Sequence, residues 1–167
     1  SNQFSIHYFF QNRNTFYNFI RNLSENCKVG GLCIGTCYDG NRVFRMLQSK
    51  KTGESVFIKN KNGTKMWDVK KLYTQSTFPD DDTSLGYAID VYQESINKTF
   101  TEYLVNFDFL IRTMENYGFV PINDGEAQRM GFPLGIGSFE NLYDAMEEDI
   151  ESGKTKGDGE FKFKKIP

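Results

Sequence analysis

One short segment near the start of the chain combines polar and aromatic residues that could hold a flat ligand. The segment Gln3–Tyr8 reads QFSIHY and contains the only histidine of the sequence, His7. If the segment is helical, Gln3 shares a face with His7, because residues four apart are neighbours. Phe4 shares a face with Tyr8 for the same reason. Residue types alone favour a structural interpretation, with aromatic residues in a core and His7 as a satisfied interior histidine.

Acidic residues offer two further candidates. The run Asp80–Asp82 could suggest a metal site, but no spaced further ligands follow it, so a solvated loop is favoured. Glu102 stands before a predicted helix, where an exposed acid is common because the helix dipole stabilises it. Taken alone, neither acidic position predicts a functional site.

The order of several motifs is more informative than any of them alone. QFSIHY at Gln3–Tyr8 is followed by KVGGLCIGT at Lys28–Thr36, TEYLV at Thr101–Val105 and YGF at Tyr117–Phe119. This series resembles the eukaryotic and viral cap guanine-N7 methyltransferases. Within that family it is most similar to the capping enzymes of large DNA viruses, including poxviruses and giant viruses. The resemblance extends from the start of the chain to about residue 145.

The resemblance implies a role for each matching residue. It implies transfer of a methyl group from S-adenosylmethionine, as co-substrate, to N7 of the guanosine that caps RNA, without a metal. It implies no catalytic residue, because N7 carries a free lone pair and needs only alignment and electrostatic stabilisation. The implied cap-binding residues are Phe4, His7 and Glu102, and the implied donor-binding residues are Gln3, Ser5 and Tyr8. Aromatic faces and one carboxylate suit a guanine that becomes positively charged.

The resemblance also implies that parts of the family fold should precede Ser1. These are the glycine-rich turn and the acids that contact the ribose and adenine of the donor. The family's cap-contacting tyrosine near its last strand has no counterpart after Tyr143. We therefore expect the isolated chain to be inactive and to need the N-terminal methyltransferase half, or other capping-enzyme domains, as a partner beside the capped RNA 5′ end.

Two alternatives stay open. The chain could be a non-catalytic, degenerate methyltransferase subunit that stabilises or stimulates a viral capping enzyme. It could also belong to a methyltransferase for another substrate. A loss of activity on Glu102→Ala with donor binding intact would argue against the latter.

Hydrophobic periodicity predicts helices that would position these residues. Phe16, Phe19, Ile20 and Leu23 form one stripe, which predicts a helix from Asn14, as its cap, to about Cys27. Further patterns predict a short helix through Val43–Leu47, a helix from Phe107 with Asn106 as cap and Gly118 as stop, and a helix opening at Ser138.

The remaining pattern predicts strands. Leu32–Cys37 is a short apolar run bounded by glycines, as expected for a strand buried on both faces, and Phe119–Ile122 predicts the start of another strand. Residues 55 to about 92 predict an inserted set of small antiparallel strands. The predicted class is α/β, the C-terminal half of a class I (Rossmann-like) methyltransferase sheet carrying that antiparallel insertion. The whole of 1–167 is interpreted as one partial domain with a basic tail from about 153, in which Glu160–Phe163 permits an edge strand.

Composition narrows the classes of function. The net charge of −2 argues against a broad nucleic-acid-binding surface, so any RNA contact should be local. The three cysteines are interpreted as small buried hydrophobic residues rather than a zinc or disulfide set. No signal peptide or membrane span is predicted. We expect an intracellular location without a membrane partner, in the cytoplasm, viral factory or virion if viral, and in the nucleus if cellular.

Overall fold

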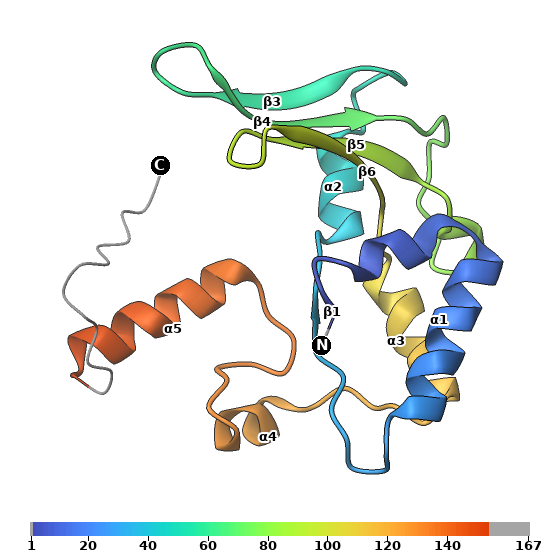
Figure 1. Cartoon of the computed structure of the whole chain (residues 1–167), viewed down its shortest axis with the longest axis vertical. Helices are drawn as coiled ribbons and strands as arrows, with labels where there is room; N and C mark the ends of the chain where they lie inside the picture. Colours follow the sequence, from blue (N-terminus) through green and yellow to red (C-terminus); the bar gives the residue numbers. More distant parts are fainter. Residues whose placement is uncertain (1, 154–167) are drawn as a thin grey trace. The chain divides into compact units, whose positions relative to one another are not determined.

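The computed structural model describes residues 2–153. For Asn2 and Gln3 it describes the backbone only. The chain divides into two compact units, residues 1–120 and 121–167, and each is described by itself. The predicted α/β class with an antiparallel insertion is confirmed (Figure 1). In the described part of the chain, no helix is long and apolar enough to span a bilayer.

The first unit is built around a four-stranded antiparallel sheet. Its strands lie in the order β3 (Ser55–Lys59), β4 (Lys65–Lys71), β5 (Ala88–Gln93) and β6 (Lys98–Tyr103). The sheet therefore reaches beyond the predicted limit near residue 92 and ends on β6 as an edge strand.

One face of this sheet carries the first hydrophobic core. Val69, Ile89 and Val91 alternate onto that face and are almost fully buried. Helix α2 (Gly40–Met46), the predicted short helix, packs against them through Val43 and Phe44 (Figure 1). The side chain of Asp39 caps α2 by accepting hydrogen bonds from two backbone N–H groups of its first turn.

The second core joins three helical elements. These are the 3₁₀ helix η1 (Ile6–Gln11), α1 (Arg13–Asn26) and α3 (Phe107–Asn116). Phe16 of α1 is fully buried and stacks on Phe109 of α3, with ring centroids 5.0 Å apart. The predicted helix α1 is confirmed, but its cap is Asn12 rather than Asn14, because Asn12 forms a capping box with Thr15.

Neighbouring residues of one segment belong to the two cores. Leu104 packs in the core beneath the sheet, and Val105 packs in the core among the helices. Val105 also forms a parallel bridge with Asp39 and accepts a hydrogen bond from the Gly40 N–H, 3.0 Å away. The chain that leaves β6 is therefore fixed from both sides.

The predicted strand at Leu32–Cys37 is only partly correct. Strand β2 comprises Gly35–Thr36 alone and pairs in parallel with β1 (Asn2–Gln3). Leu32 and Ile34 are 50% and 42% exposed, so the expected burial on both faces is wrong. Among the described residues, β1 is the one strand that pairs with β2. A parallel strand is buried only when further strands and helices flank it. Cys33 is exposed, contrary to the prediction of buried cysteines.

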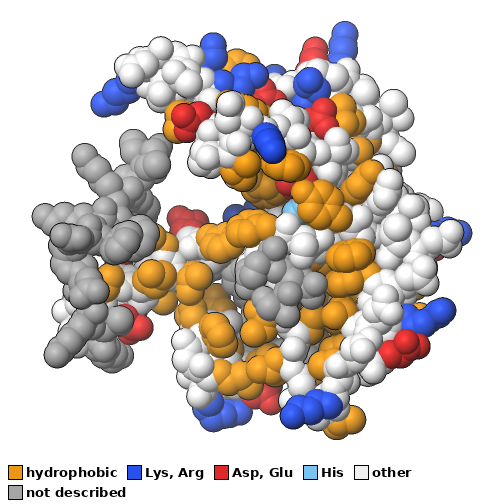
Figure 2. All heavy atoms as spheres, in the orientation of Figure 1, with side chains coloured by type: hydrophobic (Ala, Val, Ile, Leu, Met, Phe, Trp, Pro, Cys, Tyr) orange, Lys and Arg blue, Asp and Glu red, His pale blue; other side chains and the backbone are white. Residues whose placement is uncertain are grey.

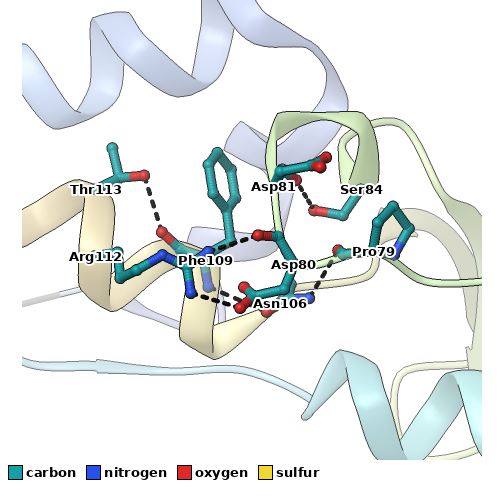
Figure 3. Close-up of polar contacts among 8 residues, drawn as sticks. All are labelled: Pro79, Asp80, Asp81, Ser84, Asn106, Phe109, Arg112 and Thr113. Atoms are coloured by element: carbon teal, nitrogen blue, oxygen red, sulfur yellow. Dashed lines mark hydrogen bonds and ion pairs between the residues drawn. The ribbon is translucent and has the colours of Figure 1, made fainter.

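The acidic loop before β5 is fastened to the helices. As Figure 3 shows, Asp80 pairs with Arg112 of α3, and the buried Asn106 side chain donates a hydrogen bond to the Pro79 carbonyl. Asp82 pairs with Arg13 of α1. No metal-ligating cluster occurs within residues 2–153, and the loop is better described as a clamp than as a freely solvated run.

Asn106 is the buried centre of this clamp, and we predict a measurable stability cost for Asn106→Ala. Its Oδ1 accepts the hydrogen bond of the Phe109 N–H (3.1 Å) while its amide group bonds Pro79. Loss of a helix cap together with a buried hydrogen bond should lower the free energy of unfolding by about 2 kcal/mol. Urea denaturation measures this, and the matched variant Asn123→Ala, which removes the cap of α4 (Asp124–Arg129) without burial, should cost less. Equal costs would contradict the special role of Asn106.

The second unit contains two capped helices within its described residues. Helix α4 was not predicted, although Asn123 and Glu126 form a capping box that marks its start. Helix α5 (Phe139–Glu151) begins after Ser138 as predicted. The predicted strand at Phe119–Ile122 is wrong, because this segment has no strand partner among the described residues. The predicted edge strand and basic tail lie outside the described residues.

Candidate functional site

The candidate site begins with a buried carboxylate on the edge strand. Glu102 of β6 lies directly opposite Ile89 of β5, so both side chains share the core face of the sheet. Only 9% of Glu102 is exposed. Burial disfavours the charged carboxylate and raises the pKa of Glu102 to about 7.

His7 faces Glu102 from η1. Its Nε2 lies 3.7 Å from the Glu102 Oε1, and the side chain is almost fully buried. Burial lowers the pKa of His7 to about 4, so the imidazole is neutral at neutral pH. The two groups are therefore close neighbours rather than an ion pair under these conditions.

Neither ring nitrogen of His7 makes a hydrogen bond within the described structure. A buried polar atom without a partner costs roughly 1–3 kcal/mol, so such atoms are rare and concentrate where a ligand completes the bonding. A neutral imidazole offers one donor and one acceptor. Together with the carboxyl group of Glu102, His7 thus presents unused hydrogen-bonding capacity at one place.

Two aromatic side chains of the segment that carries His7 lie at the surface. Phe4 is 54% exposed and Tyr8 is 42% exposed, and the Tyr8 ring centroid lies 4.3 Å from that of His7. Burial, and secondarily the charge of Glu102, raises the pKa of Tyr8. Figure 2 shows the pale blue histidine as a small visible area among hydrophobic side chains, with an acidic group next to it.

Phe4 is held in an uncommon backbone conformation. Its φ of +47° lies in the left-handed region, which costs a residue with a side chain on the order of 1–2 kcal/mol. Its N–H donates to the carbonyl oxygen and to the hydroxyl of Thr36, at 3.0 and 3.1 Å. The chain turns at Phe4, between the end of β1 and the start of η1.

The structure describes the predicted donor-binding residues less fully than the predicted cap-binding residues. Gln3 lies on strand β1, so the expected helical face shared with His7 is wrong; its side chain lies outside the described residues. The turn at Phe4 separates the two residues. Ser5 precedes η1 and makes no capping hydrogen bond with its side chain, which leaves its hydroxyl available.

Cys37 is a neighbour of the site that sequence reasoning missed. It directly follows β2, just as Phe4–Tyr8 follow β1, and the carboxyl ends of parallel strands meet at one edge, where ligands bind in α/β sheets. Burial, then the charges of Asp39 and Glu102, raises the pKa of Cys37 to about 12. Cys37 is therefore a neutral thiol beside the carboxylate. The prediction included Cys37 in the strand itself, and its place at the end of an apolar run was the signal that could have identified it.

The arrangement suits a flat heterocycle that presents N–H donors. The carboxyl group of Glu102, the neutral imidazole of His7 and the Tyr8 ring converge from β6 and from the segment after β1. The model of the mRNA (guanine-N(7))-methyltransferase domain matches residues 1–151 of the chain, which includes all of these groups. The chain belongs to this methyltransferase family. The resemblance seen in the motif order is thereby confirmed.

A relative described as a probable mRNA-capping enzyme occurs in Acanthamoeba polyphaga mimivirus. It is 31% identical over 117 residues, which is 68% of this chain and 10% of the relative. The chain thus spans about a tenth of the length of the relative that it matches. Membership of the methyltransferase family implies the use of S-adenosylmethionine and links the chain to mRNA capping.

Proposed function

We propose that this chain forms the guanine-binding side of an enzyme that methylates N7 of the guanosine at the capped 5′ end of RNA. The observation that carries this proposal is the pair formed by His7 and Glu102. Both side chains are buried, they face each other at 3.7 Å, and the nitrogens of His7 lack partners. Such a pair is costly in an empty protein and becomes favourable when a ligand completes its hydrogen bonds.

The pair complements the edge of guanine. The carboxylate of Glu102 accepts the hydrogen bonds of N1–H and of the N2 amino group, and a neutral His7 donates to O6. Adenine presents an acceptor at N1, which faces the accepting carboxylate of Glu102, and a donor at N6, which faces the donating imidazole of His7. Both contacts are therefore mismatched. The low pKa of His7, about 4, supports this assignment because the neutral imidazole leaves the carboxylate uncompensated and ready for guanine.

The reaction requires no general base. Guanine N7 has a free lone pair and no proton, so the residues need to orient the ring and stabilise the positive charge that it acquires. The negative charge of the Glu102 carboxylate stabilises the positive charge on the guanine ring. The exposed rings of Phe4 and Tyr8 can stack on guanine and attract the cation that forms.

The methyl group would come from S-adenosylmethionine. The Ser5 hydroxyl and the exposed Tyr8 ring fit part of this ligand, since a sulfonium favours an aromatic face. Gln3 on β1 is the third proposed contact. We infer that another polypeptide segment completes the donor site, because the chain corresponds to a tenth of its relative and the apolar side chains of Leu32 and Ile34 beside β2 are exposed.

Calorimetric titration of the chain with the capped dinucleotides GpppA and ApppA tests the proposal. We expect GpppA to bind at least about tenfold more tightly than ApppA, because adenine leaves the buried pair unsatisfied. His7→Ala should reduce the affinity for GpppA about tenfold, whereas His7→Gln, which keeps an amide near the Nε2 position, should lose less. Donor binding by the isolated chain should be weak.

The control variant is Glu94→Gln, an exposed acid after β5, which should leave both affinities unchanged. Equal binding of GpppA and ApppA would contradict guanine recognition. No binding of either dinucleotide by a folded chain would favour a non-catalytic subunit of a capping enzyme.

A further inference from the structure

The strand that carries Glu102 presents two more side chains on the same face. Side chains alternate along a strand, so Lys98, Phe100 and Glu102 of β6 point to one side. Their partners across β5 are Gln93, Val91 and Ile89. The row therefore runs from a cation through an aromatic ring to the carboxylate of the guanine site.

Phe100 has the properties of an unused stacking surface. Its ring is 39% exposed, although Val91 opposite it is almost fully buried. It belongs to neither hydrophobic core, and it makes no ring contact within the described structure. Because β6 is the edge strand of the sheet formed by the described residues, none of the described strands covers the outer side of Phe100.

Tyr38 lies over the end of the same face. Its hydroxyl oxygen accepts a hydrogen bond from the Trp67 Nε1 at 3.4 Å and another from the Gln93 Nε2 at 3.1 Å. Trp67 and Gln93 are directly paired across β4 and β5, and Gln93 is in turn paired with Lys98. Two accepted bonds fix the phenol oxygen and leave its own proton for an anionic acceptor.

We propose that Lys98, Phe100 and Tyr38 hold the first transcribed nucleotide of capped RNA. This inference rests on the proposed function, since it places the cap guanine at Glu102. The base of the first nucleotide stacks on Phe100, and phosphate oxygens contact the Lys98 ammonium and the Tyr38 hydroxyl. Base stacking on an aromatic ring tolerates every base, so the contact recognises capped RNA without reading its sequence.

The spacing suits such a ligand. Glu102 and Phe100 are two residues apart, which corresponds to about 7 Å along a strand. A triphosphate bridge is flexible and can fold to place the second base at that separation. The charges agree as well, because the anionic bridge and phosphates would lie near Lys98 while the carboxylate contacts the donor edge of guanine.

The test compares GTP, which offers the cap guanine alone, with GpppA, which adds the first nucleotide. Titration calorimetry of wild type, Phe100→Ala and Phe100→Leu measures both affinities, with circular dichroism as the check of folding. We expect Phe100→Ala and Phe100→Leu to weaken GpppA binding about tenfold, because each removes the stacked ring, and to leave GTP binding within about twofold. Phe57→Ala is the matched control, because this exposed phenylalanine lies on the opposite face of the sheet.

The outcomes distinguish failure of the stacking site from failure of guanine binding. Selective loss of GpppA affinity in both Phe100 variants supports the stacking site. Equal loss of GTP and GpppA affinity, or no loss of either, overturns it while guanine binding at Glu102 stands. If wild type binds neither GTP nor GpppA, the proposed function fails and the stacking site fails with it.

Discussion

Glu102→Gln is expected to weaken binding of GpppA by about 100-fold at pH 8. In the proposed complex the carboxylate accepts two hydrogen bonds from guanine, whereas the glutamine amide would retain one acceptor and turn a donor toward the ligand. The mismatch is buried, since Glu102 is 9% exposed, and water cannot compensate for it. Calorimetry of wild type, Glu102→Gln and Glu94→Gln at constant ionic strength measures the effect.

The same substitution is expected to remove the pH dependence of binding. The pKa of Glu102 is raised to about 7, so about nine-tenths of the free protein carries the carboxylate at pH 8 and about one-tenth at pH 6. Wild-type affinity for GpppA should therefore fall nearly tenfold between these values, and the variant should show no such fall. GpppA is suitable because its bridging phosphates do not titrate in this range.

The folding stability of the wild-type protein should fall as the pH rises, whereas its affinity for GpppA should increase. The folded protein holds the proton of Glu102 to higher pH than the unfolded chain, whose Glu pKa is 4.5, so wild type loses stability as pH rises from about 4.5 to 7. Glu102→Gln lacks this loss and should be more stable than wild type at pH 8, by up to about 3 kcal/mol, and not at pH 4. A variant that is less stable at pH 8 would show that Glu102 has a structural role.

Gly40→Ala is expected to lower the free energy of unfolding by about 3 kcal/mol. A Cβ atom at Gly40 would lie 2.4 Å from the carbonyl oxygen of Val105 and 2.7 Å from its backbone nitrogen and carbon. These are main-chain atoms of a fully buried residue, so no side-chain rotation relieves the clash. Helix α2 must move away from the segment that follows Glu102, and GpppA binding should weaken as well.

Urea denaturation of Gly40→Ala beside Gly125→Ala checks this prediction. Gly125 lies in helix α4, where an added Cβ meets neighbouring atoms no closer than 3.4 Å. Alanine is favourable in such a helical position, so this control should be neutral or slightly stabilising. An unfolding midpoint of Gly40→Ala equal to that of wild type would contradict the packing described at Val105.

Local signals predicted the longer helices α1, α3 and α5 well, although α4 was missed. The stripe through Phe16 and Phe19 and the caps at Asn106 and Ser138 are set by residues close in sequence, and all correspond to observed helices. The error at Asn14 arose because either of two asparagines could cap the same helix. The capping box with Thr15 decides in favour of Asn12.

Non-local pairing explains what the sequence could not provide. An apolar run such as Leu32–Cys37 is buried only when other strands flank it, and Phe119–Ile122 forms a strand only when it has a partner. The resemblance placed His7 and Glu102 in one site, but their separation depends on the register of β6 and on the turn at Phe4. The row of Lys98, Phe100 and Glu102 is visible as period-two spacing once β6 is known.

The adjacency of Leu104 and Val105 has a consequence for motion. A single peptide bond connects Leu104 in one core to Val105 in the other, so a displacement of the backbone in one core is transmitted to the other. Glu102 stands only two residues before this junction. We therefore expect fluctuations that would open the proposed guanine site from the β6 side to be rare, because they would also disrupt the helical core, and we expect the proposed binding surface to be rigid before any ligand arrives.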